Sequence, residues 1–565
     1  MTSRDLATTR AERQIRFASE IRYCDGPGLR RLTYAGLTWL NTNHVTVNAL
    51  NVFPVPDGDT GTNMLLTMQA AWNEIVESDE NHVGQVAHAV AHGALMGARG
   101  NSGVILSQIW RGFARSLDGL ETFDADQLLT AFLEGRDTAY RGVGKPVEGT
   151  ILTVIKDTAE AVAQARPLSA DLRYLLEVAV QAAHASVART PELLPVLKQA
   201  GVVDSGGKGL MFVLEGMLRY LRGLPLDKPV EQAITPLSLA AVGVALNAVE
   251  PGQEWETVVD FRPRGSLDMP VFYNRLEPLG TSIQLGEGDG VYRVHIHLLK
   301  TKRYDPIELA EEFGTVIGVH MENLLDQLEE QETARVEEPL GLKPVTPGQI
   351  AVVAVSPGPG FARILASLGV AALVSGGQTM NPSTQDILQA IGDLPTERVI
   401  VLPNNKNIIL AAQQAAEHSV KQVTVVPTRT VPQGLAAMLG YVPEGDLETV
   451  RTAMEKSSGE IETGEITTAT RTVELNGVAV REGQIIGLHN GSLKVAGDDL
   501  SETLMRLLAV MDASEREIIT LYYGAEVTAE QAEQMKAALL AAYANLEVEI
   551  HSGGQPHYHY ILSAE

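Results

Sequence analysis

Four stretches rich in glycine and small polar residues stand directly before helical patterns between residues 29 and 224. They are residues 51–63, 97–103, 144–150 and 204–209. After the first of them, the apolar residues Leu65, Met68 and Trp72 recur at helical spacing. The first turn of a helix has unpaired backbone N–H groups, so four such starts on one rim of a helical bundle would favour polyphosphate. The pattern predicts an all-α N-terminal domain, although any single stretch could be an ordinary helix connection.

The first stretch contains two carboxylates, in Asp57-Gly58-Asp59, followed by Thr60-Gly61-Thr62-Asn63. Oxygen donors at this density suit a small hard cation such as Mg²⁺, which also binds the phosphates of a nucleotide. Asp57 and Asp59 are two residues apart, so in an extended segment their side chains point to the same side. A divalent cation would remove the repulsion between them. An acidic surface turn is the alternative, because Asp-Gly is common in turns.

Length and charge exclude several classes of protein. A chain of 565 residues is too long for one core and suggests three or four domains. Its net charge of −26 argues against binding to nucleic acid or to anionic lipid, since both need a basic face. The single cysteine, Cys24, excludes an intrachain disulfide and fits a reducing cytoplasm. No apolar run reaches the roughly 20 residues of a membrane span, so we expect no integral membrane segment.

Two patterns resemble known sites without meeting their requirements. Gly206-Gly207-Lys208 lacks the Ser or Thr that follows the lysine of a P-loop, because Gly209 stands there. His88 and His92 lie one helical turn apart, as in zinc proteases, but Ala89 replaces the catalytic Glu. We therefore expect neither site, and we interpret the two histidines as packing or surface residues.

In the middle of the chain, residues 254–340, apolar and polar residues alternate at 255–261 and 291–298, which is typical of strands. A helical pattern follows at 306–313. This predicts a small α+β domain. His295 and His297 are two apart in one expected strand and would share a face. They could be two zinc ligands, a proton-transfer pair or half-exposed strand residues.

The third region begins with a buried-strand pattern at 350–355 and continues with strands that alternate with helices. This alternation predicts an α/β domain with a parallel sheet, and we expect it to continue through the tail from Val473 to Glu565. His557 and His559 are then expected on an edge strand. Polar loops follow three strands, at 376–383, 402–407 and 427–430. Such loops bind ligands in open α/β sheets, but without an evident nucleophile we favour protein docking.

Several long motifs, taken in order, resemble those of the ATP-binding subunits of bacterial fatty acid kinases. Residues 51–64 are similar to the nucleotide loop of the L-type subunit of bacterial dihydroxyacetone kinases. Residues 98–103, 376–383 and 402–407 are similar to motifs of the fatty acid kinase family. The resemblance implies three domains. They are a dihydroxyacetone kinase L-like helical barrel that binds ATP (1–226), a middle α+β domain (249–340) and a DegV-like α/β domain for partner docking (347–565).

The resemblance also implies site residues. Asp57 and Asp59 would be the catalytic residues and Mg²⁺ ligands, with Asn51 as a further ligand. ATP would be held by residues that match the phosphate and nucleoside motifs: Thr60, Gly61, Thr62, Asn63, Asn101, Ser102, Gly149, Asp204 and Gly206. A Zn²⁺ site in the middle domain would comprise His295, His297 and Glu256, which stands where the family has a cysteine.

The activity that the resemblance implies is transfer of the ATP γ-phosphoryl to a fatty-acid carboxylate, giving an acyl phosphate. The fatty acid would be presented by a separate DegV-like lipid-binding protein. Such transfer depends on positioning and charge neutralisation, and an ionised carboxylate needs no strong base. We further expect a cytoplasmic homodimer that acts in phospholipid metabolism. The alternatives are a kinase for dihydroxyacetone (glycerone) or another small polyol, and a non-catalytic nucleotide-binding adaptor.

Overall fold

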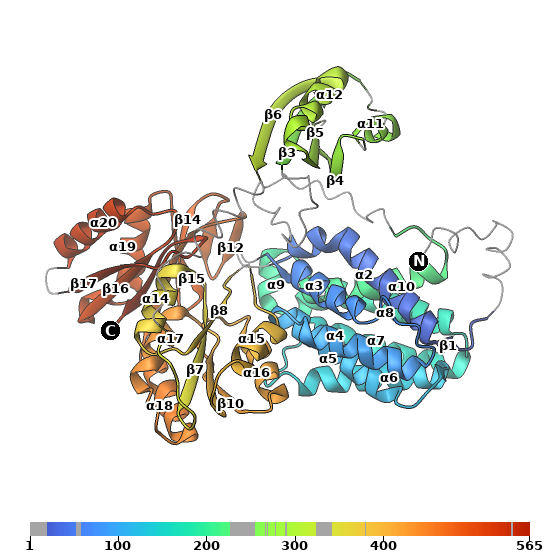
Figure 1. Ribbon diagram of the computed structural model, residues 1–565, viewed down its shortest axis with the longest axis horizontal. Coiled ribbons are helices and arrows are strands. Elements are labelled where there is room, and N and C mark those ends of the chain that lie inside the picture. The colour runs from blue at the N-terminus through green and yellow to red at the C-terminus, as the bar shows by residue number, and fades with distance from the viewer. Residues whose placement is uncertain are drawn as a thin grey trace. The chain divides into compact units, whose positions relative to one another are not determined.

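The computed structural model describes residues 20–51, 58–226, 255–323 and 342–565, apart from residues 266, 268, 277, 289, 290, 379, 544 and 545. By its contacts the chain forms two compact units, Met1–Val230 with Gly341–Glu565, and Glu231–Leu340. The first unit joins the helical region to the C-terminal α/β region, and the second contains the middle sheet (Figure 1). In the part of the chain that the structure describes, no helix has the length and apolar content to cross a membrane.

The N-terminal region is helical, as its periodicity predicts (Figure 1). Its helices are α2 (Gly26–Asn48), α3 (Thr60–Asn73), α4 (Val83–Met96), α5 (Gly100–Ser116), α6 (Ala125–Arg141), α7 (Ile151–Ala165), α8 (Leu172–Leu193), α9 (Pro195–Ala200) and α10 (Ser205–Leu221). The short strands β1 (Cys24–Asp25) and β2 (Thr122–Phe123) pair in antiparallel fashion. From α2 to α8 each helix packs on the next, and α10 packs on both α2 and α8, which closes a ring of contacts.

The interior of this ring is apolar. Trp39, Leu40, Met64 and Met68 are fully buried there, within a larger core of buried apolar side chains, and burial of apolar surface is the main favourable contribution to folding. A cavity of about 930 Å³ also lies among the helices, lined mainly by apolar side chains from α2, α5, α6 and α10. Cys24 is buried beside it, and burial raises the pKa of its thiol to about 12.

The middle unit is an α+β fold. It contains β3 (Trp255–Pro263), α11 (Met269–Leu276), β4 (Gly280–Gly288), β5 (Val291–Leu298), α12 (Asp305–Phe313) and β6 (Gly314–Asn323). The strands form an antiparallel sheet in the order β4-β5-β3-β6. Its core is built from alternate strand residues such as Val294 and Ile296, together with Phe272 of α11.

A parallel sheet opens the C-terminal region, as predicted. Its strands are β7 (Ile350–Ser356), β8 (Ala372–Ser375), β9 (Arg398–Leu402) and β10 (Gln422–Val425), in the order β10-β9-β7-β8. All three pairings are parallel, and every residue of β7 is buried. The helices of this part are α14 (Pro359–Ser367), α15 (Thr384–Gly392), α16 (Ile409–His418), α17 (Val431–Ala437) and α18 (Leu447–Gly459).

The tail differs from the expected continuation of that pattern. It forms a second sheet from β11 (Glu462–Thr468), β14 (Ile485–His489), β15 (Ser492–Gly497), β16 (Ile518–Tyr523), β17 (Glu547–Ser552) and β18 (Tyr558–Ala564). Its order is β15-β14-β11-β18-β16-β17, and in it the pairing of β16 with β17 alone is parallel. The remaining elements are the hairpin of β12 (Val473–Leu475) and β13 (Val478–Val480), and the helices α19 (Leu500–Val510) and α20 (Ala529–Ala542).

Two Asn-Gly turns explain the pairing of β12 with β13 and of β14 with β15. Asn476-Gly477 and Asn490-Gly491 have positive φ at both residues, the conformation that joins neighbouring antiparallel strands in a tight hairpin. The prediction of an edge strand for His557 and His559 is wrong, because His557 directly precedes β18 and β18, which contains His559, lies between β11 and β16. His559 is instead inside the sheet, with its Nε2 3.0 Å from Thr468 Oγ1.

Contacts within the first unit join the α/β region to the helical region around the start of α5. Ala98 and Val104 belong to the same buried apolar cluster as Val353 of β7 and Ile387 of α15. The backbone N–H of Thr384 donates to the carbonyl of Ala98 at 3.2 Å. The α/β region therefore packs directly against the helix start that the sequence marks as an anion site.

Candidate nucleotide site

Three of the four glycine-rich stretches of the candidate site run into the first turn of a helix, and the fourth, 144–150, ends directly before α7. Thr60–Asn63 opens α3, Asn101 and Ser102 lie in the first turn of α5, and Gly206 lies in the first turn of α10. Close packing is the reason that these turns contain glycine. A Cβ at Gly61 would lie 2.3 Å from the carbonyl oxygen of His44, which is closer than real contacts allow. From sequence alone these residues are predicted to form loops, because glycine is most often a turn residue.

The structure brings the four predicted stretches together. Asn51 Oδ1 accepts hydrogen bonds from Thr60 Oγ1 at 2.8 Å and from Ser205 Oγ at 3.0 Å, so it joins the starts of α3 and α10. A Cβ added to Gly206 would lie 3.4 Å from both Ser102 Oγ and Ile151 Cβ, so the starts of α5 and α7 meet α10 at the same place. Asn51, predicted as a metal ligand, uses both lone pairs of its amide oxygen in these two contacts, and a metal would have to replace one hydroxyl.

Asp59 is a carboxylate of this site, at the start of α3. It is 8% exposed, and it immediately precedes α3. Its Oδ2 accepts a hydrogen bond of 2.6 Å from Nδ2 of Asn381, a residue of the α/β region. Asp57, its expected partner, lies outside the described residues. In the part of the chain that the structure describes, no group of three or more His, Cys, Asp or Glu side chains lies close enough together to hold a metal ion.

The starts of α3 and α5 differ in how their backbone N–H groups are satisfied. Asn48 of α2 accepts hydrogen bonds from Gly61 N at 2.7 Å and Thr62 N at 3.2 Å through its Oδ1. Its Nδ2 donates to Thr62 Oγ1 at 3.0 Å. Sequence reasoning missed Asn48, because this capping side chain comes from another helix. As a result the N–H groups of Gly61 and Thr62, predicted to hold phosphate, already have a protein acceptor.

The start of α5 is the better anion site. Within the described residues, no side chain caps this helix, and Arg99 occupies its N-cap position. Gly100 has a φ of +56°, and a Cβ there would lie 2.7 Å from Asn63 Nδ2, so the chain needs glycine to place Asn101 and Ser102 at the helix start. An uncapped helix N-terminus has N–H groups and a positive dipole end for an anion.

The start of α10 is capped by Asp204. Its Oδ2 accepts from Gly207 N at 2.6 Å, while its backbone N–H donates to Thr190 Oγ1 at 3.0 Å. Burial raises the pKa of this carboxyl to about 6, although hydrogen bonds from the N–H groups of Gly207 and Ile151 oppose the shift. An aspartate held in a setting that disfavours its charge is typical of functional sites.

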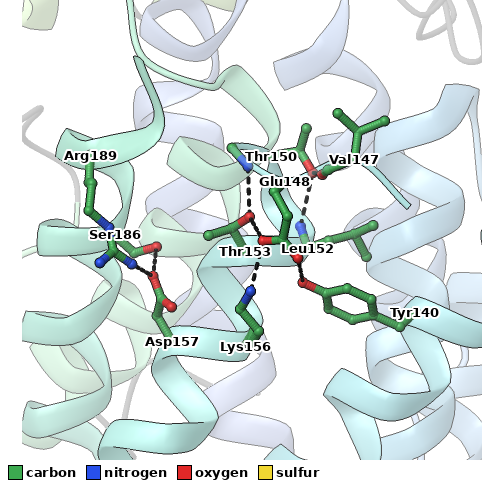
Figure 2. A network of polar contacts seen from close by, with 11 residues as sticks. Tyr140, Val147, Glu148, Thr150, Leu152, Thr153, Lys156, Asp157, Ser186 and Arg189 are labelled. Carbon is green, nitrogen blue, oxygen red and sulfur yellow. Dashed lines mark hydrogen bonds and ion pairs between the residues drawn. The ribbon is translucent and has the colours of Figure 1, made fainter. Parts of the chain in front are cut away.

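A network around Glu148 fixes the start of α7 (Figure 2). Gly149, predicted as a nucleoside contact, has a φ of +82° and donates its N–H to Thr153 Oγ1 at 2.8 Å. Glu148 Oε2 accepts from Thr153 Oγ1 at 2.6 Å and lies 2.8 Å from Lys156 Nζ. Burial disfavours the charge of Glu148, but the hydrogen bonds from Lys156, Thr153 and Tyr140 outweigh it and lower its pKa. Its occupied oxygens give Glu148 a structural role.

The histidine patterns have different outcomes. His88 contacts Asp118, and His92 Nδ1 lies 3.4 Å from Glu74 Oε1, so each exposed histidine of α4 faces a carboxylate, as expected for surface residues. In the middle unit, the strand register places Glu256 of β3 opposite His297 of β5, and His295 opposite Val258. The side chains of the three predicted zinc ligands lie outside the described residues, so the zinc site stays a prediction.

The three polar loops predicted at the carboxyl ends of parallel strands also meet. They line a cavity of about 510 Å³ in the C-terminal region with Gly376–Gln378, Pro403–Lys406, and Arg429 with Thr430. Glu465 and Tyr558, from the second sheet, line the same cavity. The parallel topology explains the convergence, because the carboxyl ends of parallel strands lie at one edge of a sheet.

Comparison with known proteins identifies the family. Residues 351–565 match the FakA-like C-terminal family model, which describes the C-terminal part of fatty acid kinase subunits, and residues 54–219 match the DAK2 domain. Protein YloV of Bacillus subtilis is 38% identical over 558 residues, which cover 96% of this chain and 100% of that protein. The chain belongs to the FakA-like family of fatty acid kinase subunits. An uncharacterized protein of Staphylococcus saprophyticus is 36% identical over 96% of this chain and 99% of its own length.

Among solved structures, similar chains include the DegV family protein Cg2579 of Corynebacterium glutamicum. It is 16% identical, with a TM-score of 0.30, and the match covers 38% of this chain and 96% of that one. A fatty-acid-binding DegV family protein of Thermus thermophilus is 14% identical, with a TM-score of 0.29 over 38% of this chain and 99% of that one.

Membership of this family implies use of a nucleotide, and the DAK2 match contains every described helix start of the candidate site. The residues present fit a nucleotide. The uncapped start of α5 suits phosphate, and the nearly buried carboxylate of Asp59 suits a hard cation.

Proposed function

We propose that this chain is the ATP-binding subunit of a fatty acid kinase and transfers the γ-phosphoryl of ATP to a fatty-acid carboxylate. The observation that carries the proposal is the position of Asp59, a nearly buried carboxylate beside the uncapped start of α5, in a chain of this family. The closed ring of helix contacts is consistent with the helical barrel expected for the nucleotide domain. The family's description as a subunit supports a second protein that presents the fatty acid.

The chain's own residues would act mainly by positioning. The N–H groups of Asn101 and Ser102 would hold phosphate oxygens at the positive end of α5. Asp59, together with Asp57, would hold Mg²⁺, and that ion supplies charge neutralisation on the phosphoryl oxygens. Gly149, Asp204 and Gly206 would lie toward the nucleoside.

The acceptor chemistry needs little more from the protein. A fatty-acid carboxylate is already ionised at neutral pH, so no general base has to remove a proton. One carboxylate oxygen forms a bond to the γ-phosphorus while the bond from that phosphorus to the bridging oxygen breaks. The electron pair of the broken bond leaves with ADP, and the product is an acyl phosphate. Precise alignment of the two reactants supplies much of the rate enhancement in such a reaction.

The test is Asp59→Asn, measured as transfer of radiolabelled γ-phosphate from ATP to a fatty acid bound to a purified lipid-binding protein. We expect at least a hundredfold loss of turnover with unchanged circular dichroism, because the site loses the charge that would hold the cation. Asp118→Asn is the matched control, since Asp118 is an exposed carboxylate of the same region. Equal turnover of Asp59→Asn and Asp118→Asn would refute the assignment.

A second function is favoured by the DAK2 match over residues 54–219, a kinase-type domain. It is phosphorylation of dihydroxyacetone or a related small polyol. The same assay with dihydroxyacetone in place of the bound fatty acid separates the two, because labelled product appears with one acceptor alone. Absence of transfer to either acceptor would favour the nucleotide-binding adaptor. The expected homodimer and the cytoplasmic location stay predictions.

A further inference from the structure

Asn381 connects the α/β region to the carboxylate of Asp59. Asn381 is 1% exposed and Asp59 is 8% exposed, so their hydrogen bond of 2.6 Å is shielded from water. The orientation of the amide follows from chemistry, since its oxygen would be repelled by the carboxylate. Hydrogen bonds to an ionised carboxylate in such surroundings are about twice as strong as neutral ones.

The backbone of Asn381 is held from the same side. Arg99 Nη1 donates to the carbonyl oxygen of Asn381 at 2.8 Å, and Arg99 is the N-cap residue of α5. Asn381 Nδ2 would also lie 3.6 Å from a Cβ added to Gly100, the first residue of that helix. A single residue of the α/β region therefore contacts both the carboxylate and the helix start proposed to hold cation and phosphate.

The amide oxygen of Asn381 lies in an environment that packing alone does not explain. Its Oδ1 is buried, and among the described residues it has no hydrogen-bond partner. A buried amide oxygen without a partner is normally disfavoured and is rare in folded proteins. Its presence here argues against a purely structural role, because an apolar residue of the same size would fill the space without an unmet polar atom.

We propose that Asn381 is a positioning residue of the nucleotide site: it orients the Asp59 carboxylate, so the chemistry of the helical region depends on the α/β region. The inference rests on the proposed function of Asp59. Carboxylates that bind metals are themselves held by hydrogen bonds, and loss of such a contact typically weakens metal affinity or activity about ten- to a hundredfold. The α/β region then has a role in the reaction besides partner docking.

The test compares Asn381→Leu with Gln414→Leu in the full chain. Gln414 is the matched control because it also joins the two regions through a buried side-chain hydrogen bond, to Gln108 at 2.8 Å, but it does not contact Asp59. Binding of a non-hydrolysable ATP analogue is titrated by calorimetry at several Mg²⁺ concentrations, and thermal unfolding is recorded for each variant. Turnover and KM for ATP are measured with partner-bound fatty acid.

We expect both variants to melt at similar temperatures. Asn381→Leu alone should need about ten- to a hundredfold more Mg²⁺ for nucleotide binding, and its turnover should fall by a similar factor. In an Asp59→Asn background, Asn381→Leu should cause no further loss of Mg²⁺-dependent binding. Asn381→Ser, which keeps a donor, should recover part of the affinity.

Equal Mg²⁺ dependence of Asn381→Leu and Gln414→Leu would overturn the inference while leaving the proposed function intact. If the wild type binds the Mg²⁺ nucleotide but transfers phosphate to no acceptor, the proposed function fails and the binding comparison still decides the role of Asn381. A wild type that binds no Mg²⁺ nucleotide would overturn both.

Discussion

The pH dependence of stability should reveal the charge of Asp204. Burial raises the pKa of this carboxyl from 3.8 to about 6 in the folded chain. That difference corresponds to about 3 kcal/mol by which the fold disfavours the ionised form. Below pH 3.8 the carboxyl is protonated in both states. Between pH 3.8 and about 6 the folded chain retains a proton that the unfolded chain has released, so the free energy of unfolding falls as the pH rises through this window.

The perturbation is Asp204→Asn. Asn is as good an N-cap as Asp, so α10 keeps its cap while the titration disappears. Between pH 5 and pH 7.5 the wild type should lose about 1.4 kcal/mol of stability through this group, and the variant should lose none of it. At pH 7.5 the variant should be more stable than the wild type by up to about 3 kcal/mol. Subtracting the two profiles removes the contributions of distant titrating groups.

The assay is urea unfolding without nucleotide, followed by tryptophan fluorescence. Three of the chain's four tryptophans, Trp39, Trp72 and Trp110, lie in the helical region, so the signal reports mainly on its unfolding. Asp124→Asn is the matched control, because Asp124 caps α6 of the same helical region through its side chain, as Asp204 caps α10, but it is not fully buried. The reasoning is refuted if Asp204→Asn keeps the wild-type pH dependence, or if Asp124→Asn gains the same stability at pH 7.5.

The other predictions address a helix cap and the two proposed metal sites. Asn48→Ala should destabilise the helical region by about 1–2 kcal/mol in the same urea assay, since Gly61 N and Thr62 N lose their acceptor. Asn73→Ala, on the exposed end of α3, is its control and should change stability little. Asp59→Asn should lower phosphoryl transfer at least a hundredfold, and Asn381→Leu should raise the Mg²⁺ requirement, each measured against its control variant. Metal analysis should find about one zinc per chain that a His295→Ala, His297→Ala double variant lacks; zinc retained by that variant would contradict the predicted site.

Elements with strong local periodicity could be predicted from the sequence. The predicted strand at 291–298 has the bounds of β5, and the helix predicted at 306–313 agrees with α12 to within one residue, because each segment has an apolar pattern of one period and clear ends. The parallel sheet followed from buried strands that alternate with helices. The fold of the tail was harder to predict. The Asn-Gly pairs at 476 and 490 indicate hairpins, but the prediction gave more weight to the alternation of strands and helices. The interior position of β18 has no local signal, since it depends on pairing with β11 and β16.

Within the candidate site, the motif residues were predictable and their partners were not. Asn48 lies 13 and 14 residues from the N–H groups that it caps, and Asn381 lies 322 residues from Asp59. Neither contact follows a helical or strand period, so no window of sequence contains its signal. The glycines were difficult to interpret for a related reason. Composition alone suggests that a glycine marks a flexible turn, whereas here glycine is needed because helices pack closely at these positions.

Arg99 shows why the site needs both regions. A cation at the N-cap of α5 faces the positive end of the helix dipole, an arrangement that typically costs about 0.3–1 kcal/mol. The α/β region compensates for this cost, because the guanidinium of Arg99 donates to the Asn381 carbonyl and lies 3.6 Å from the Asp386 carboxylate. A bound phosphate would add a second counter-charge at the same helix start. The helical region alone would lose the contacts that hold Arg99 and Asp59. We therefore expect that the motif residues of that region are not sufficient by themselves to form the proposed site.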